Sequence, residues 1–203
     1  MKKLALAALV SISMVATVHG SSSISAGKEK SAVCQSCHGE TGNSIGPDFP
    51  SLAEQQTSYI IKQLQDFQSG KRKNDTMQPM AASLNEQDMK DIAAYFASQK
   101  ITPGTPAAGK EAIALGETLF QKGKSSDGIA ACNGCHGANA KGHWASVFPA
   151  LAGQRAEYIV AQLKNFRSSN RANDPMMLMR HQAVRLKDEQ INALAAYLNS
   201  LAL

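Results

Sequence analysis

The chain has 203 residues, of which 43% are hydrophobic and 18% are charged, and its formal net charge is +5. An apolar fraction of this size excludes an intrinsically disordered chain, because disordered sequences are poor in apolar residues and rich in charge. Only 5% of the residues are aromatic and the basic residues form no stripe, so the positive charge does not predict a nucleic-acid partner.

The first twenty residues have the pattern of a secretory signal peptide. Lys2 and Lys3 are followed by a small, apolar run over residues 4–18, and a cleavage position follows at Gly20. The alternative is a retained membrane anchor, which needs about 18 or more apolar residues, and this run is shorter. We therefore expect residues 1–20 to be removed and the mature chain to be soluble, without a transmembrane anchor, outside the cytoplasm.

All four cysteines fall in two copies of one motif, Cys-x-x-Cys-His, at residues 34–38 and 132–136. A thioredoxin-type dithiol would follow a strand, and the chain shows almost no strand-like alternation. A zinc site gives no reason for a histidine directly after each pair. Covalent attachment of haem explains every residue, because the two thiols add to the vinyl groups and the histidine lies under the iron. The motifs predict two covalently bound haem c groups, attached through Cys34, Cys37, Cys132 and Cys135, with His38 and His136 as iron ligands.

The repeat extends well beyond the cysteines. The attachment motifs are 98 residues apart, Phe-Pro at 49–50 and 148–149 and the pair Gln55 and Gln154 are 99 apart, and the closing Ala-Ala-Tyr runs are 102 apart. Between the two copies lies a stretch with two prolines and two glycines and no apolar periodicity, which is typical of a linker. We expect a signal peptide at 1–20, an N-terminal domain at 21–98, a linker at 99–109 and a C-terminal domain at 110–203.

Apolar residues recur at helical spacing in both halves, which predicts an all-α fold. The clearest helix faces are Ile60, Leu64 and Phe67 in the first half and Ile159, Leu163 and Phe166 in the second. A last helix closes each half, and Ser83 with Glu86 offers a capping box ahead of the first one. A further helix should precede each attachment motif, most clearly over residues 111–122. Each domain is small, so we expect the apolar faces of haem to complete its core.

The second axial ligand separates an electron carrier from an enzyme. A methionine raises the reduction potential and closes the iron to substrates, whereas an open position permits peroxide or oxygen chemistry. The candidates are Met77, Met80, Met176, Met177 and Met179. Counting forward from the Asn-Asp pairs aligns Met80 with Met179, while counting back from the leucine before each last helix aligns Met77 with Met179. Met179 is favoured either way, and Met89 belongs to a helix face and is expected in the core.

Together, the signal peptide, the two Cys-x-x-Cys-His halves, the Phe-Pro-x-Leu-Ala-x-Gln segments, the Arg-x-Asn-Asp runs and the closing Ala-Ala-Tyr helices resemble the di-haem cytochrome c4 family over essentially the whole mature chain. The resemblance implies two tandem cytochrome c-like helical domains, each built around one haem. It implies Met77 and Met179 as axial iron ligands, with the other three methionines packing at the haem edge. It also implies that the carbonyls of Pro50 and Pro149 accept the Nδ1 protons of His38 and His136.

The same resemblance implies a single-electron carrier and not an enzyme. Its expected partners are membrane redox complexes, with a quinol-oxidising cytochrome bc complex as donor and a terminal haem-copper oxidase as acceptor. We expect a monomer in a bacterial periplasm whose two domains pack with their haems facing. The alternatives are a cytochrome subunit of a larger oxidoreductase and a di-haem enzyme, such as a peroxidase or a thiosulfate-oxidising cytochrome. Such enzymes usually leave one iron five-coordinate or give it an unusual ligand.

Other polar residues carry less information. His143 and His181 have no counterpart in the other half and are expected at the surface or the haem edge, and the unmatched Trp144 is expected to pack. Arg72 and Arg171 do match, and two interpretations stay open for them. They pair with haem propionates, or they are solvated arginines on loops.

Charge is divided unevenly between the halves. Residues 21–100 hold 8 basic and 9 acidic side chains, while residues 101–203 hold 11 basic and 7 acidic ones. The mature chain therefore has a charge of −1 on its first half and +4 on its second. We interpret this as a dipole that presents different ends to different partners.

Overall fold

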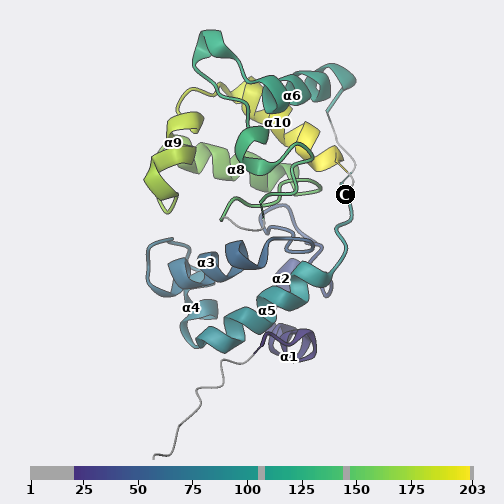
Figure 1. Cartoon of the computed structure of the whole chain (residues 1–203), viewed down its shortest axis with the longest axis vertical. Helices are drawn as coiled ribbons and strands as arrows, with labels where there is room; N and C mark the ends of the chain where they lie inside the picture. The colour runs from purple at the N-terminus through teal and green to yellow at the C-terminus, as the bar shows by residue number, and fades with distance from the viewer. Residues whose placement is uncertain (1–20, 105–107, 144–146, 202–203) are drawn as a thin grey trace, which may run out of the picture.

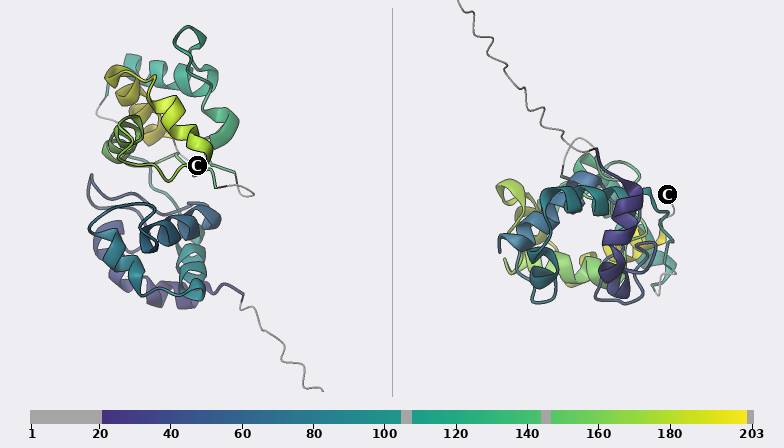
Figure 2. Two further views of the ribbon diagram at one scale, coloured as in Figure 1. Left: turned by 90° about the vertical axis from the view of Figure 1, so that its left-hand side faces the viewer. Right: turned by 90° about the horizontal axis from the view of Figure 1, so that it is seen from below.

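Two helical domains are stacked along the long axis of the molecule (Figure 1 and Figure 2). The structure is a computed structural model, and it describes residues 21–104, 108–143 and 147–201. The N-terminal domain holds α1 (Ile24–Lys30), α2 (Ala32–His38), α3 (Thr57–Gln68), α4 (Met77–Ala82) and α5 (Glu86–Ser98). The C-terminal domain holds α6 (Lys110–Lys122), η1 (Ser125–Asp127), α7 (Asn133–His136), α8 (Ala156–Arg167), η2 (Pro175–Met177), α9 (Leu178–Ala183) and α10 (Asp188–Ser200).

The prediction of an all-α fold is confirmed. Within the described ranges, the only β feature is an isolated bridge between Lys124 and Ile129. The same ranges contain no helix with the length and apolar character that crossing a membrane requires. The expected signal peptide, residues 1–20, and Trp144 lie outside the described residues.

The last helix of each domain packs across the first one, and a glycine stands at each crossing. A Cβ atom on Gly27 of α1 would lie 2.0 Å from the carbonyl oxygen of Asp91 on α5, and one on Gly116 of α6 would lie 2.0 Å from that of Ala193 on α10. Real Cβ atoms do not approach an oxygen this closely. Glycine therefore allows the two backbones to touch in both domains.

The cap of α5 differs from the expected one. Asn85 is the N-cap, and its side chain accepts the backbone N–H of Asp88 at 2.9 Å while the Asp88 carboxylate accepts the N–H of Asn85 at 3.0 Å. The expected box between Ser83 and Glu86 is wrong, because Ser83 is the C-cap of α4. Asn and Asp are both strong at these positions, so the helix begins at the pair that leaves α4 its full length.

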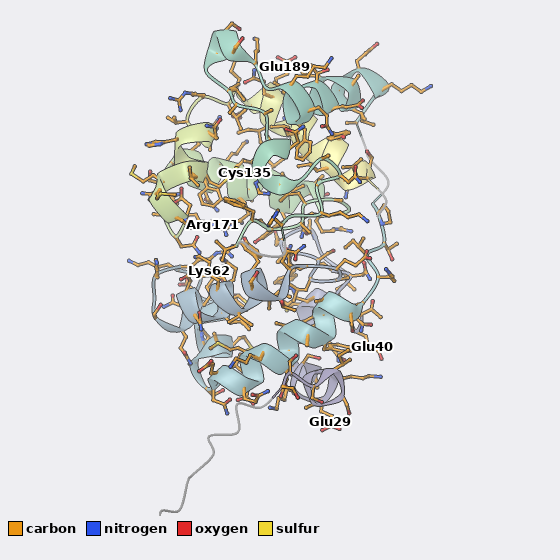
Figure 3. The ribbon with its side chains drawn as sticks, in the orientation of Figure 1. Glu29, Glu40, Lys62, Cys135, Arg171 and Glu189 are labelled. Atoms are coloured by element: carbon orange, nitrogen blue, oxygen red, sulfur yellow. The ribbon has the colours of Figure 1, made fainter. Side chains whose placement is uncertain are left out.

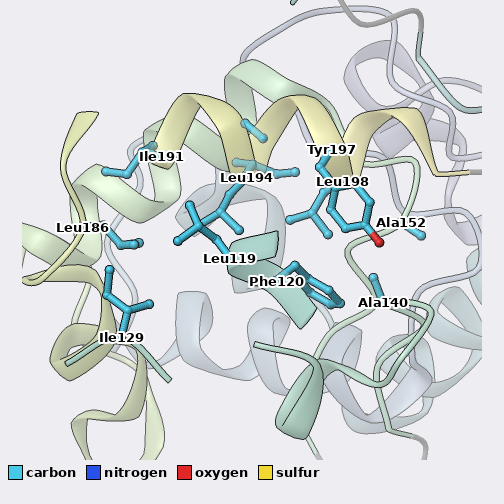
Figure 4. Packing of buried hydrophobic residues seen from close by; sticks show 12 residues of the cluster. Leu119, Phe120, Ile129, Ala140, Ala152, Leu186, Ile191, Leu194, Tyr197 and Leu198 are labelled. Carbon is cyan, nitrogen blue, oxygen red and sulfur yellow. The ribbon is translucent and has the colours of Figure 1, made fainter. Parts of the chain in front are cut away.

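Each domain has its own apolar core. In the C-terminal domain, α6 and α10 bury Leu119, Phe120, Ile191 and Leu194, and the cluster continues to Ile159 of α8 (Figure 4). The N-terminal cluster is built on α3 and α5, with members Ile60, Leu64, Phe67, Met89, Ile92, Ala93, Tyr95 and Phe96. The helix faces predicted from spacing therefore point into the cores. Met89 is 2% exposed, which confirms it as a core residue.

The connection between the domains is hydrogen-bonded to each of them. Helix α5 ends at Ser98 and α6 begins at Lys110. The backbone N–H of Ile101 donates to Glu54 at 3.1 Å in the N-terminal domain, and that of Gly104 donates to the carbonyl of Asn199 at 3.2 Å in the C-terminal domain. The loops after α2 and α7 and the helices α3 and α8 lie where the two domains meet (Figure 1).

Candidate haem sites

The two attachment motifs lie on short helices that end at their histidines. Cys34 and Cys37 belong to α2, Cys132 is the N-cap of α7, and Cys135 lies in the single turn of α7, where Figure 3 labels it. None of the four cysteines forms a disulfide. Burial raises the pKa of the Cys34 thiol, and it raises the pKa of the Cys132 thiol to about 11. Both groups are therefore neutral thiols in this fold.

The two histidines are buried and oriented in the same way. His38 and His136 are each 6% exposed, and their Nδ1 atoms lie 2.8 Å and 3.0 Å from the carbonyl oxygens of Pro50 and Pro149. A carbonyl can only accept, so each Nδ1 carries the proton and each Nε2 keeps its lone pair for a metal ion. Burial lowers the pKa of both imidazoles, although the proline carbonyls oppose this. The expected histidine–proline bonds are confirmed.

A phenylalanine supports each ring. The edge of Phe49 meets His38 at a centroid distance of 6.3 Å, and Phe148 meets His136 at 6.4 Å. Both phenylalanines directly precede the proline that accepts the Nδ1 proton. Each Phe-Pro pair therefore fixes its histidine through a ring contact and a hydrogen bond, which explains why the pair recurs in both halves.

The methionines differ in burial. Met77 opens α4, is half-buried, and packs against the same apolar cluster as Cys34. Met179 lies in α9 and is also half-buried. The three others are exposed, with Met80 at 42%, Met176 at 82% and Met177 at 45%. Burial thus favours Met77 and Met179 over the three alternatives as groups that face the interior.

These donors fit a c-type haem in each domain. Each half presents two cysteines that form no disulfide, an imidazole with Nε2 available, and a half-buried thioether. In the part of the chain that the structure describes, no three His, Cys, Asp or Glu side chains gather into a site that could hold a metal ion directly.

Arg72 lies at the interface between the domains. Its guanidinium donates to Gln63 of its own domain at 2.8 Å and reaches Tyr158 at 2.9 Å and Gln162 at 3.0 Å in the other. The group also lies over the ring of Phe67, 4.7 Å from its centroid. Although burial opposes it, the nearby guanidiniums hold the pKa of the Tyr158 hydroxyl below its ordinary value.

Arg171 repeats these contacts from the C-terminal domain (Figure 3). It donates to Gln162 at 2.8 Å within its domain, and to the Tyr59 hydroxyl at 2.8 Å and Gln63 at 3.1 Å across the interface. It is 8% exposed. The interpretation of these arginines as solvated loop residues is wrong. Sequence reasoning missed their partners, although the tyrosines and glutamines recur at the same offset as the arginines.

The contacts of Asn173 at the interface are not repeated by the aligned residue of the other domain. Asn173 donates to Asp66 of α3 at 2.6 Å and to Gln63 at 2.9 Å, and its carbonyl accepts from Lys62 at 2.9 Å. Lys62 also pairs with Asp66. The aligned Asn74 stays within its own domain and accepts the backbone N–H of Met77 at 2.8 Å. Asn173 therefore joins the domains, while Asn74 caps the segment that begins with Met77.

Comparison with known proteins identifies close relatives. The sequence profile of the cytochrome c family matches residues 24–100 and 113–202. Cytochrome c4 of Pseudomonas aeruginosa is 40% identical over 202 residues, which cover 99% of this chain and all of the relative. The crystal structure of reduced recombinant cytochrome c4 from Pseudomonas stutzeri has a TM-score of 0.84 and 43% identity, and the match covers 89% of this chain and 99% of that one. A thiosulfate dehydrogenase electron acceptor of Stutzerimonas stutzeri is 40% identical over 81% of this chain and 76% of its own length.

Proposed function

Because this chain belongs to the di-haem cytochrome c4 family, we propose that it carries single electrons between larger redox proteins and makes or breaks no bond of a substrate. Each of its two cytochrome c domains has one covalently bound haem c, whose iron accepts and releases one electron when bound. The observation that carries the proposal is the matched pair of buried histidines, each with Nδ1 occupied and Nε2 available.

We assign the haem contacts by position in the motif. Cys34 and Cys37 would attach one haem and Cys132 and Cys135 the other, while His38 and His136 would each supply an iron ligand. Met77 and Met179 would supply the second ligand of each iron, and their half-buried positions support this choice. A thioether ligand closes the iron to peroxide and oxygen, which favours a carrier over an enzyme.

The donor, the acceptor and the compartment are proposed on chemical grounds. Delivery of electrons from a cytochrome bc complex to a terminal oxidase suits a carrier with two His/Met sites of raised potential. Relatives named thiosulfate dehydrogenase electron acceptors support an enzyme that oxidises thiosulfate as a second class of donor. The signal-like residues 1–20 support a periplasmic location, and we propose 21–98 and 110–203 as the two domains, joined by 99–109.

The ligand assignment is tested by absorption of the oxidised holoprotein. Met77→Ala and Met179→Ala should each remove about half of the weak near-infrared band that arises from charge transfer between methionine sulfur and ferric iron, because each leaves one of two irons without its thioether. Met80→Ala and Met177→Ala are the matched controls and should keep the full band. A high-spin iron in the wild-type protein, or loss of the band in a control, would contradict the assignment.

The carrier function is tested by electron exchange. The reduced wild-type protein should be reoxidised stoichiometrically, two electrons per chain, by a haem-copper oxidase in the presence of oxygen. Turnover of thiosulfate or peroxide by the isolated protein, with no exchange with any oxidase, would identify an enzyme instead.

A further inference from the structure

One peptide unit of the N-terminal domain is hydrogen-bonded at both ends. Its carbonyl, from Pro50, accepts the Nδ1 proton of His38 at 2.8 Å. Its N–H, from Ser51, donates to the side-chain oxygen of Gln154 in the C-terminal domain at 2.8 Å. Gln154 also donates its amide to the carbonyl of Ser51 at 2.9 Å. The side chain of Gln154, in the C-terminal domain, therefore binds the peptide unit that orients His38 in the N-terminal domain.

The reverse arrangement occurs in the C-terminal domain. The carbonyl of Pro149 accepts the Nδ1 proton of His136 at 3.0 Å, and the N–H of Ala150, in the same peptide unit, donates to Gln55 of the N-terminal domain at 2.8 Å. Gln55 donates back to the carbonyl of Ala150 at 2.9 Å. Since Gln55 and Gln154 are aligned in the repeat, the two domains exchange the same contact.

Both contacts are shielded from water and fixed in orientation. Ser51, Gln55, Ala150 and Gln154 are 5–7% exposed. The oxygen of each glutamine also accepts the next backbone N–H in its own chain segment, at 2.9 Å for Gln154 and 3.0 Å for Gln55. Neither amide can rotate without losing three hydrogen bonds, so both oxygens stay aimed at the peptide N–H of the other domain.

An amide that donates through its N–H becomes a stronger acceptor at its carbonyl, because hydrogen bonds in a chain polarise one another, and more so where water is excluded. A stronger acceptor on Nδ1 increases the electron density of the imidazole and its basicity as a ligand. We propose that Gln154 tunes the iron ligand His38 and that Gln55 tunes His136, each across the domain interface through one peptide unit. They are positioning residues that act through another residue, and the reduction potential of each site is set in part by its neighbour.

This inference rests on the proposed roles of His38 and His136, and it has a definite sign. A more electron-rich imidazole stabilises ferric iron over ferrous iron, so the glutamine contact lowers the potential of the site. Its removal should raise the potential of the iron in the other domain and leave that of its own domain unchanged. A loss of stability alone would not produce this crossed pattern.

The experiment uses the holoprotein with Gln154→Met and, separately, Gln55→Met. Midpoint potentials are resolved by domain from the NMR signals of the two haems during a redox titration. We expect Gln154→Met to raise the potential of the N-terminal site alone, and Gln55→Met that of the C-terminal site alone. In the reduced protein, the Nδ1 proton of His38 should shift upfield in Gln154→Met, since its hydrogen bond weakens.

Two further variants complete the test. Gln56→Met removes another cross-domain bond, from Gln56 to the carbonyl of Lys141 at 2.6 Å, and should move neither potential, because that carbonyl does not hold a histidine. Gln154→Glu keeps an oxygen acceptor for Ser51, so the N-terminal potential should not rise above that of the wild type. Unchanged potentials, or equal shifts at both sites in either glutamine variant, would overturn the inference.

Gln154→Met and Gln55→Met test the two domains independently. If one variant fails to fold, the other still decides the question. Failure of the proposed function would look different. It would appear already in the wild-type protein as the absence of two reversible one-electron couples, whereas failure of the inference leaves both couples intact and insensitive to the glutamines.

Discussion

The first and last helices cross in the same way in both domains, yet the side chains around the crossing differ in chemistry. Gly27 and Gly116 meet equivalent backbone positions, and in both domains a Cβ atom added to the glycine would lie 2.8 Å from the Cβ of a tyrosine. One turn further along, α1 has Lys30 where α6 has Leu119. Lys30 forms ion pairs with Asp88 at 2.6 Å and Asp91 at 3.0 Å, whereas Leu119 is 1% exposed in an apolar cluster.

The buried phenylalanine of the crossing also lies on different helices in the two domains, on the last helix of the N-terminal domain and on the first helix of the C-terminal domain. In the N-terminal domain Phe96 of α5 is fully buried, and the aligned position on α10 is Leu198. In the C-terminal domain Phe120 of α6 is fully buried, and the equivalent position in the N-terminal domain is Ser31, the C-cap of α1. Tyr95 and Tyr197 lie close to these rings, with centroids 5.2 Å and 5.8 Å apart.

The two crossings share their backbone contact and differ in the side chains around it. The close backbone contact is shared, so it fixes the geometry, while the surrounding side chains are free to be charged or apolar. Helix α1 contributes no member to the N-terminal cluster of buried residues, whereas α6 contributes Leu119 and Phe120 to the C-terminal one. The N-terminal crossing therefore adds partly exposed ion pairs to the shared backbone contact, and the C-terminal crossing adds apolar burial.

The largest expected effect on stability comes from truncating Leu119, and truncation of the matched Lys30 is the comparison. Leu119→Ala should lower the free energy of unfolding of the C-terminal domain by about 3 kcal/mol, because it removes buried methyl groups and leaves a cavity. Lys30→Ala should destabilise the N-terminal domain far less, since its side chain is 35% exposed and solvent screens its pairs. Denaturant unfolding of the holoprotein, with amide exchange followed in α5 and α10, resolves the two domains. Equal losses in both domains would contradict this division.

A smaller effect should appear at neutral pH and be lost in acid. The backbone N–H of Ser23, with Lys30 and Gln87, holds the pKa of the Asp91 carboxyl below its ordinary 3.8. A depressed pKa contributes stability that is present above pH 3.8 and is lost as the pH falls through the folded value. Asp91→Asn should therefore destabilise the N-terminal domain by about 1 kcal/mol at pH 7.

The pH profile checks the cause of that loss. The difference in unfolding free energy between Asp91→Asn and the wild type should shrink below pH 3.8, where the wild-type carboxyl also becomes neutral. The aligned residue in the C-terminal domain is Ala193, so that domain should show no such difference. A difference that stays constant from pH 7 to pH 3 would mean that Asp91 acts by shape and not by charge.

Much of this fold could be predicted from the sequence because its signals are local. Helical spacing located α3, α5, α8 and α10, and the attachment motifs pointed to both histidines. The proline acceptors came from the family resemblance, and the supporting phenylalanine rings were not expected. The glycine crossing escaped notice because Gly27 and Gly116 are 89 residues apart, an offset that differs from every other match in the repeat. The roles of Arg72 and Arg171 depend on how the domains meet, and no pattern within one domain encodes that.

A second difference between the domains lies beside the proposed axial methionines. Helix α4 carries no charged residue, whereas α9 and the turn after it carry Arg180, Arg185 and Lys187. Arg180 is paired with the buried carboxylate of Asp174 at 2.8 Å, and the other two are exposed. Part of the positive excess of the second half therefore lies on the surface next to Met179.

This surface leads to the smallest of the expected effects, a change in electron-transfer rate. Arg185→Glu should slow oxidation of the C-terminal haem by the anion hexacyanoferrate(III) about threefold at low ionic strength, because it replaces an attractive charge with a repulsive one. Ser83→Glu at the aligned exposed position is the matched control and should leave that rate unchanged. The difference should vanish at about 1 M salt, where the Debye length is about 3 Å. If the rates of the two domains depend on ionic strength equally in the wild-type protein, the charge asymmetry does not direct partners to different ends, because the field near α9 would then be no stronger than the field near α4.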